Sequence, residues 1–96
     1  MKKVEGKIVN IRKETHDVKT FEVELKEPIA FIPGQYCLVS IKGYEELEGE
    51  KRPFTFANSP QKTSEEGKID LTIKKMGEFT KAMHSLEEGA EVIIRG

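Results

Sequence analysis

The sequence predicts an all-β protein, a six-stranded antiparallel Greek-key barrel with one short helix before the last strand. Short stretches in which apolar and polar residues alternate recur along the chain, as is typical of half-buried strands. Turn-forming residues separate these stretches, and a single segment has the spacing of an amphipathic helix. Because strands and helices do not alternate, we expect antiparallel pairing rather than an open parallel sheet. The length of 96 residues fits one domain over residues 1–96.

Three strands are predicted in the first half of the chain. Residues 3–12 alternate apolar and charged side chains, and so do residues 18–25, in which glutamates separate apolar positions. A hairpin is the simplest connection between these two strands. Residues 36–41 form a continuous apolar and β-branched run, which indicates a buried third strand after a loop that contains proline and glycine.

The second half of the chain contains three further strands and the helix. Residues 43–50 are polar and acidic, which predicts an exposed loop, and residues 61–67 form a second polar loop. From Glu78 onward the apolar residues recur at helical spacing, so we expect a short helix that stops before Gly89. The predicted strands of this half cover residues 52–57, 68–75 and 92–94.

Composition and charge argue against several classes of function. The chain has 16 Lys and Arg residues against 17 Asp and Glu residues, so its net charge of −1 gives no electrostatic footprint for nucleic acid or anionic lipid. No apolar run approaches the roughly 20 residues of a membrane span. The first residues also lack the apolar core of a signal peptide. We therefore expect a cytoplasmic protein.

Residues that often bind metals or act as nucleophiles are few and scattered. His16, His84 and Cys37 lie on different predicted elements without the spacing of metal ligands, so no metal site is expected. A single cysteine also excludes an internal disulfide. We expect Cys37, Tyr36 and Met83 to be core residues. His84 is expected on the surface of the helix.

Four consecutive residues of the predicted fourth strand combine a cation, a stiff backbone, a ring and a hydroxyl: Arg52, Pro53, Phe54 and Thr55. A guanidinium offers a planar fork of donors to a pyrophosphate. An aromatic ring offers a face to a flat ring system, and a threonine hydroxyl can donate or accept a hydrogen bond. This order of chemistries suits a flavin dinucleotide. Such a tetrapeptide also occurs by chance, so its interpretation depends on the rest of the chain.

Two further segments strengthen that interpretation. Residues 31–36 read Phe-Ile-Pro-Gly-Gln-Tyr, and the strand residues 71–75 are followed by Gly-Glu-Phe-Thr at 77–80. Together with the motif at residues 52–55, they resemble the flavin-binding barrel of the ferredoxin–NADP reductase superfamily over essentially the whole chain. The resemblance implies the barrel fold and FAD as the cofactor, with FMN less expected. It also implies that the chain is the FAD-binding domain of an NAD(P)H-dependent oxidoreductase or electron-transfer subunit.

The resemblance implies roles for individual residues as well. Arg52 would hold the pyrophosphate, Phe54 would lie against the isoalloxazine, and Thr55 would hydrogen-bond near the reactive nitrogen of that ring. No residue of this chain is expected to be catalytic. The pyrophosphate would also be contacted by Gly77, Phe79 and Thr80. The ribityl chain would be lined by Thr72, Ile73 and Lys74, and Lys74 would add charge near the pyrophosphate.

The chain departs from the family pattern in two ways. Phe54 stands where tyrosine is usual, so a phenolic hydrogen bond to the cofactor is lost. Family members also continue past the last strand into a nicotinamide-nucleotide domain, whereas this chain ends at Gly96. We therefore expect NAD(P)H to bind to a missing domain or a partner subunit, and electrons to pass to an acceptor such as an iron–sulfur protein. We expect no turnover by these 96 residues alone.

Alternative interpretations remain open at two levels. Phe79 is also compatible with the buried face of the helix, and Thr80 with an ordinary residue of its first turn. For the chain as a whole, the alternative function is that of a non-catalytic barrel. Such a barrel would have the family's fold, would serve as an interaction or scaffolding module and would bind little flavin.

Overall fold

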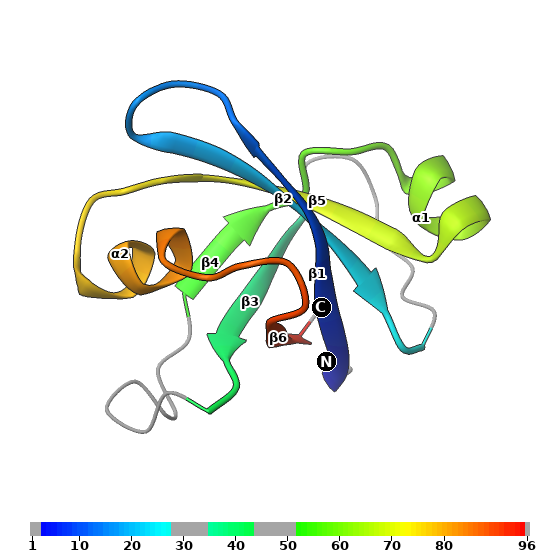
Figure 1. The fold of residues 1–96 in the computed structure, drawn as a ribbon. Helices are drawn as coiled ribbons and strands as arrows, with labels where there is room; N and C mark the ends of the chain where they lie inside the picture. Colours follow the sequence, from blue (N-terminus) through cyan, green and yellow to red (C-terminus); the bar gives the residue numbers. More distant parts are fainter. Residues whose placement is uncertain (1–2, 28–34, 44–51, 96) are drawn as a thin grey trace.

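Six strands and two short helices make up the computed structural model, which describes residues 3–27, 35–43 and 52–95 (Figure 1). The strands are β1 (Lys3–Lys13), β2 (Val18–Leu25), β3 (Tyr36–Ile41), β4 (Arg52–Thr55), β5 (Lys68–Lys74) and β6 (Glu91–Arg95). The helices are α1 (Pro60–Glu66) and α2 (Glu78–His84). All six strands lie where the sequence predicts them, with ends that differ by at most two residues. Neither of these described helices is long and apolar enough to cross a membrane.

The strands form one antiparallel sheet in the order β4-β3-β6-β1-β2-β5. Its two outer strands meet just beyond the end of β4, where Phe56 forms a bridge with Leu71 of β5. The amide of Ala57 donates to the carbonyl oxygen of Asp70 at 2.9 Å, which adds a second link across this junction. The sheet is therefore a nearly closed barrel, and the predicted all-β Greek-key class is confirmed.

Alternate residues of each strand fill the interior of the barrel. In β5, for example, Ile69, Leu71 and Ile73 are completely buried, whereas Thr72 is exposed. α2 lies beside β4 (Figure 1) and contributes Phe79 and Met83 to the same core. The period of two therefore identified the inward face of the strands, and the helical spacing identified the buried face of α2.

A glycine in β1 allows two strands to approach closely. Gly6 pairs with Leu25 of β2 and with Val92 of β6. A Cβ atom at Gly6 would stand 2.5 Å from Cγ1 of Val23 and 3.4 Å from the carbonyl oxygen of Glu24. Val23 is completely buried, and its β-branched side chain has few alternative rotamers. There is thus no room for a side chain at this position.

We expect the substitution Gly6→Ala to destabilise the barrel. Overpacking of a filled core costs about 1–3 kcal/mol, because the clash with Val23 has to be relieved by shifting β1 or β2. Urea unfolding followed by circular dichroism measures the free energy of unfolding. An unchanged free energy in Gly6→Ala would show that the two strands are farther apart than described.

A second helix, α1, occupies the segment that the sequence analysis assigned to a polar loop over residues 61–67. This prediction was wrong. The hydroxyl of Ser59 caps the helix by accepting from the amide of Lys62 at 3.3 Å, Pro60 stands in its first turn, and Gly67 ends it with φ of 69°. These start and stop signals are present in the sequence, but the polar residues between them have no apolar periodicity to indicate a helix.

Two side chains lie differently from the prediction. Tyr36 was expected in the core, but its side chain is 55% exposed at the start of β3. His84 was expected on the helix surface, but it is half-buried and its ring packs edge-on against Phe21 at a centroid distance of 6.0 Å. Its Nε2 lies 2.7 Å from the carbonyl oxygen of Ile73, which can only accept, so Nε2 carries the proton. His84 therefore fastens the end of α2 to β5.

Candidate functional site

Two of the predicted cofactor residues, Thr55 and Thr72, meet where β4 pairs with β5. The bridge between Phe56 and Leu71 brings Thr55 next to Thr72 across this junction, which we call the seam of the barrel. Phe56 and Leu71 are buried, so the two threonines before and after them face outward, and both are exposed. The fold therefore places two hydroxyl groups from distant parts of the sequence side by side on the outer surface.

The aromatic ring of the motif faces the other way. Phe54 is paired with Cys37, which is buried, and its half-buried side chain packs against the core. Its ring stacks on that of Phe79 at a centroid distance of 6.2 Å and an interplanar angle of 25°. In this structure Phe54 thus joins β4 to α2. Contact between Phe54 and an isoalloxazine stays a prediction.

Arg52 and Pro53, the first two residues of the motif, lie on β4 next to β3. The backbone of Arg52 pairs with Val39 of β3, but its side chain lies outside the described part of the structure. Pro53 pairs with Leu38 and is exposed. Of the upstream segment 31–36, residues 31–34 lie outside the described residues.

The turn between β5 and α2 is shaped by a threonine. The Oγ1 atom of Thr80 accepts from the amides of Met76 and Gly77, at 2.8 and 3.0 Å, and lies 3.3 Å from the carbonyl oxygen of Gly77. The hydroxyl that was expected to contact a pyrophosphate is therefore engaged with the backbone in this structure. Phe79, one residue earlier, is buried, which agrees with its alternative role in the core.

None of the described residues gives Gly77 a steric reason to be a glycine. Its φ of −160° is open to any residue, and a Cβ atom built there would meet no atom of the described residues within 4 Å. The position thus faces open space next to the first turn of α2. A ligand could approach the backbone closely at this point.

The three predicted residues of β5 differ in orientation. The side chain of Ile73 is completely buried, so only its backbone could reach a ligand outside the barrel. Thr72 is exposed, and its hydroxyl lies 2.9 Å from that of Thr20 on β2. Lys74 is exposed too, with Nζ 3.9 Å from Oδ2 of Asp17. Thr72 and Lys74 therefore present a hydroxyl and a cation to the surface beside the seam.

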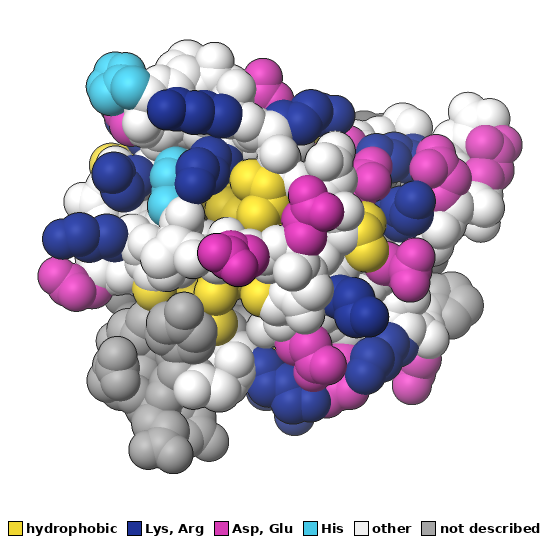
Figure 2. All heavy atoms as spheres, in the orientation of Figure 1, with side chains coloured by type: hydrophobic (Ala, Val, Ile, Leu, Met, Phe, Trp, Pro, Cys, Tyr) yellow, Lys and Arg dark blue, Asp and Glu magenta, His cyan; other side chains and the backbone are white. Residues whose placement is uncertain are grey.

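Cationic side chains lie around the turn between β5 and α2. Lys74, Lys75 and Lys81 are exposed around the turn and α2, and Figure 2 shows Lys and Arg side chains over the β1–β2 hairpin and α2. A hydrogen bond from Thr15 holds the pKa of Asp17 below its usual value of 3.8, so this carboxylate stays ionised among them. The arrangement favours an anionic group such as a phosphate.

The thiol of Cys37, on β3, is not activated for nucleophilic chemistry. Burial raises the pKa of Cys37 to about 12, so the thiol stays protonated at neutral pH. Its side chain is 1% exposed, which confirms its predicted role in the core. The residues beside the seam are suited to binding and orienting a ligand rather than to nucleophilic chemistry.

Two exposed apolar side chains beside these residues were missed by sequence reasoning. Tyr36 is the strand partner of Thr55, and Met76, which is 80% exposed, precedes Gly77. Each is a single large side chain in a polar context, and neither has a periodic signal that would mark it as functional. Tyr36 thus lies next to the seam, and Met76 lies next to the open space at Gly77.

The strand order and the near closure of the barrel are those of the flavin-binding barrels of the ferredoxin reductase superfamily. This chain belongs to the oxidoreductase FAD-binding domain family, whose model matches residues 5–96.

Known relatives agree with this assignment. The chain is 31% identical over 93 residues to the sulfhydrogenase 2 gamma subunit of Pyrococcus furiosus, covering 97% of this chain and 29% of that protein. It is 34% identical over 90 residues to a probable electron transfer subunit of dihydroorotate dehydrogenase B (NAD(+)) from Methanocaldococcus jannaschii, covering 94% and 29%. The ferredoxin reductase in carbazole 1,9a-dioxygenase matches with a TM-score of 0.85 and 29% identity over 99% of this chain and 28% of its own. The chain thus spans less than a third of these relatives.

Proposed function

We propose that residues 1–96 form a domain that binds FAD on the outer surface of the seam and relays electrons between a nicotinamide nucleotide and an acceptor. The nicotinamide nucleotide would be bound by another domain or a partner subunit. The observation that carries this proposal is the family match over residues 5–96, together with the meeting of Thr55 and Thr72 at the seam. The names of the relatives, a sulfhydrogenase subunit, a probable electron transfer subunit and a ferredoxin reductase, support an electron-transfer role with an iron–sulfur partner.

Each group near the seam would contribute to binding. The hydroxyls of Thr55 and Thr72 would hydrogen-bond the flavin ring and the ribityl chain. Arg52 and Lys74 would hold the pyrophosphate, and the backbone at Gly77 would lie against it. When bound, FAD accepts an electron pair from one partner and passes electrons on to another. The protein orients the ring and sets the electrostatic field around it. The proposed compartment is the cytoplasm, which the presence of a single cysteine supports.

A titration with FAD tests this function. The 96-residue chain should quench or enhance flavin fluorescence in a saturable way, and the purified holoprotein should be yellow. We expect weaker binding than in an intact reductase, because a second domain would cover part of the cofactor. No saturable signal up to millimolar FAD would contradict the proposal and favour the non-catalytic barrel.

We expect the substitution Gly77→Ala to weaken FAD binding without affecting the fold. A Cβ atom at this position meets no atom within 4 Å in the described part of the chain, but it would stand where the cofactor's backbone contact is proposed. A methyl group that forces a bound phosphate away from the chain should raise the dissociation constant roughly tenfold, as the loss of one hydrogen bond to a charged group would. Fluorescence titration gives the dissociation constant.

The variant Gly6→Ala is the matched control for Gly77→Ala. It adds the same methyl group at a crowded interior position, so it should lower the free energy of unfolding and leave the FAD affinity of the folded protein unchanged. Gly77→Ala should show the opposite pattern. Equal FAD affinities of Gly77→Ala and the wild type would place the cofactor away from this turn.

A further inference from the structure

The seam that separates the two proposed FAD-binding strands has few backbone links. β2 and β5 pair over the full stretch from Val18 to Glu24. β4 and β5, in contrast, are joined by the bridge at Phe56 and the hydrogen bond from Ala57 to Asp70. A junction of this kind has little cooperative stability of its own. Its geometry must be fixed by other contacts.

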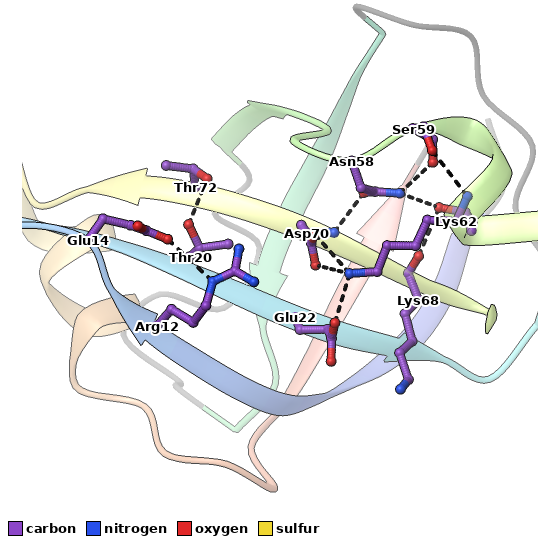
Figure 3. Close-up of polar contacts among 11 residues, drawn as sticks. Arg12, Glu14, Thr20, Glu22, Asn58, Ser59, Lys62, Lys68, Asp70 and Thr72 are labelled. Atoms are coloured by element: carbon purple, nitrogen blue, oxygen red, sulfur yellow. Dashed lines mark hydrogen bonds and ion pairs between the residues drawn. The ribbon is translucent and has the colours of Figure 1, made fainter.

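An asparagine side chain extends the seam where the backbone pairing stops. Oδ1 of Asn58 accepts from the amide of Asp70 at 2.8 Å, in the way that a strand carbonyl would. Nδ2 of Asn58 donates to Oγ1 of Thr63 at 2.9 Å and to the carbonyl oxygen of Ser59 at 2.7 Å. Figure 3 shows Asn58 between α1 and β5. One side chain thus connects the end of β4, helix α1 and strand β5.

A lysine of α1 forms ion pairs with β5 and β2 next to the same junction. Nζ of Lys62 lies 2.9 Å from both carboxylate oxygens of Asp70 and 2.8 Å from Oε2 of Glu22 on β2 (Figure 3). The three side chains are 22%, 11% and 21% exposed in the order Lys62, Asp70 and Glu22, so solvent screens these pairs less than ordinary surface pairs. The hydrogen bond from Lys62 holds the pKa of Glu22 below its usual value of 4.5, which keeps the pair charged at neutral pH.

We propose that Asn58 and Lys62 are positioning residues for FAD, an inference that rests on the proposed function. They fix β4 relative to β5 on one side of the bridge between Phe56 and Leu71. Thr55 lies on the other side of that bridge, next to Thr72. The latch formed by Asn58 and Lys62 therefore sets the spacing of two hydroxyls, of which one would bind the flavin ring and the other the ribityl chain of the same cofactor. Neither latch residue needs to touch the cofactor.

Thermodynamic linkage follows from this arrangement. A ligand that bridges β4 and β5 binds the closed seam and not the open one, so it stabilises the closed seam. FAD should therefore slow hydrogen exchange of the Ala57 amide, which donates across the seam to Asp70. The amide of Leu25, which donates to the carbonyl oxygen of Gly67, lies outside the seam and serves as the internal reference.

The variant Asn58→Ala tests the proposal. At a temperature at which both proteins are fully folded, the FAD dissociation constant should rise roughly 3- to 10-fold. The variant loses the hydrogen bond to the Asp70 amide across the seam and the two hydrogen bonds to Thr63 and Ser59. Lys62→Met should have an effect in the same direction. The matched control is Gln61→Ala, which removes an exposed hydrogen bond to Glu65 on the same helix and should leave the dissociation constant unchanged.

The outcomes separate this inference from the proposed function. If the wild-type chain shows no saturable FAD binding, the proposed function fails and the inference fails with it. If the wild type binds FAD and Asn58→Ala lowers only the melting temperature, with an unchanged dissociation constant, Asn58 is merely structural and the inference alone is overturned. The inference is also overturned if FAD does not change the hydrogen exchange of the Ala57 amide in the wild type. This result does not depend on whether the variants fold.

Discussion

Arg52→Ala should raise the FAD dissociation constant of this domain roughly 10- to 150-fold, which corresponds to about 1.5–3 kcal/mol for a lost hydrogen bond to a charged group. The backbone of Arg52 is held in β4 by its pairing with Val39, three residues before Thr55. The guanidinium is proposed to hold the pyrophosphate through two parallel hydrogen bonds. Flavin fluorescence titration of the folded variant measures the change.

Two further variants show whether the effect comes from the guanidinium. Arg52→Lys keeps the charge but loses the planar fork of donors, so its affinity should fall between those of the wild type and Arg52→Ala. Lys26→Ala removes a cation that pairs with Glu5 just after the end of β2 and should have no effect on FAD binding. An unchanged dissociation constant in Arg52→Ala would mean that this residue serves the fold.

The strands could be predicted because their signal is local. A strand with one buried face shows a period of two in its own residues, and β2 and β5 display it without reference to the rest of the molecule. Helix α1 has no such signal, since Thr63 is its one buried residue. What holds α1 in place is Lys62, which reaches Asp70 and Glu22 on two strands. These are tertiary contacts that no local period encodes.

The candidate site, like the fold, has features that the sequence indicates locally and features that depend on tertiary contacts. The outward position of Thr72 follows from the alternation of β5, but its nearness to Thr55 depends on the meeting of β4 and β5, which the sequence analysis did not predict. The stacking of Phe54 on Phe79 was not predictable, because it exists only when α2 has packed beside β4. The Thr80 hydroxyl bonds the Met76 and Gly77 amides, which are local contacts at the start of α2 that compete with its predicted role at the pyrophosphate. Sequence motifs thus identified the ligand class, while the structure assigned several motif residues to holding the site together.

The 96-residue chain should not accelerate the reduction of its bound FAD by NADH or NADPH beyond the rate of free FAD. Hydride transfer requires the nicotinamide and the flavin to be held face to face in a near-attack geometry, and such positioning can contribute about 7–11 kcal/mol to lowering a barrier. The described residues offer one proposed site, at the seam between β4 and β5, and a barrel with one site holds one of the two reactants. Anaerobic stopped-flow measurement of flavin bleaching with each nucleotide gives the rate.

Dithionite provides the control for this experiment, because it reduces flavin without a nucleotide site. It should bleach the bound FAD fully, which shows that the cofactor in the domain is reducible. Rapid reduction by NADH or NADPH that saturates with nucleotide concentration would mean that these 96 residues contain a second nucleotide site. If reduction is slow with the chain alone and becomes fast when a nicotinamide-binding domain or subunit is added, the flavin at the seam accepts its electrons across a domain boundary.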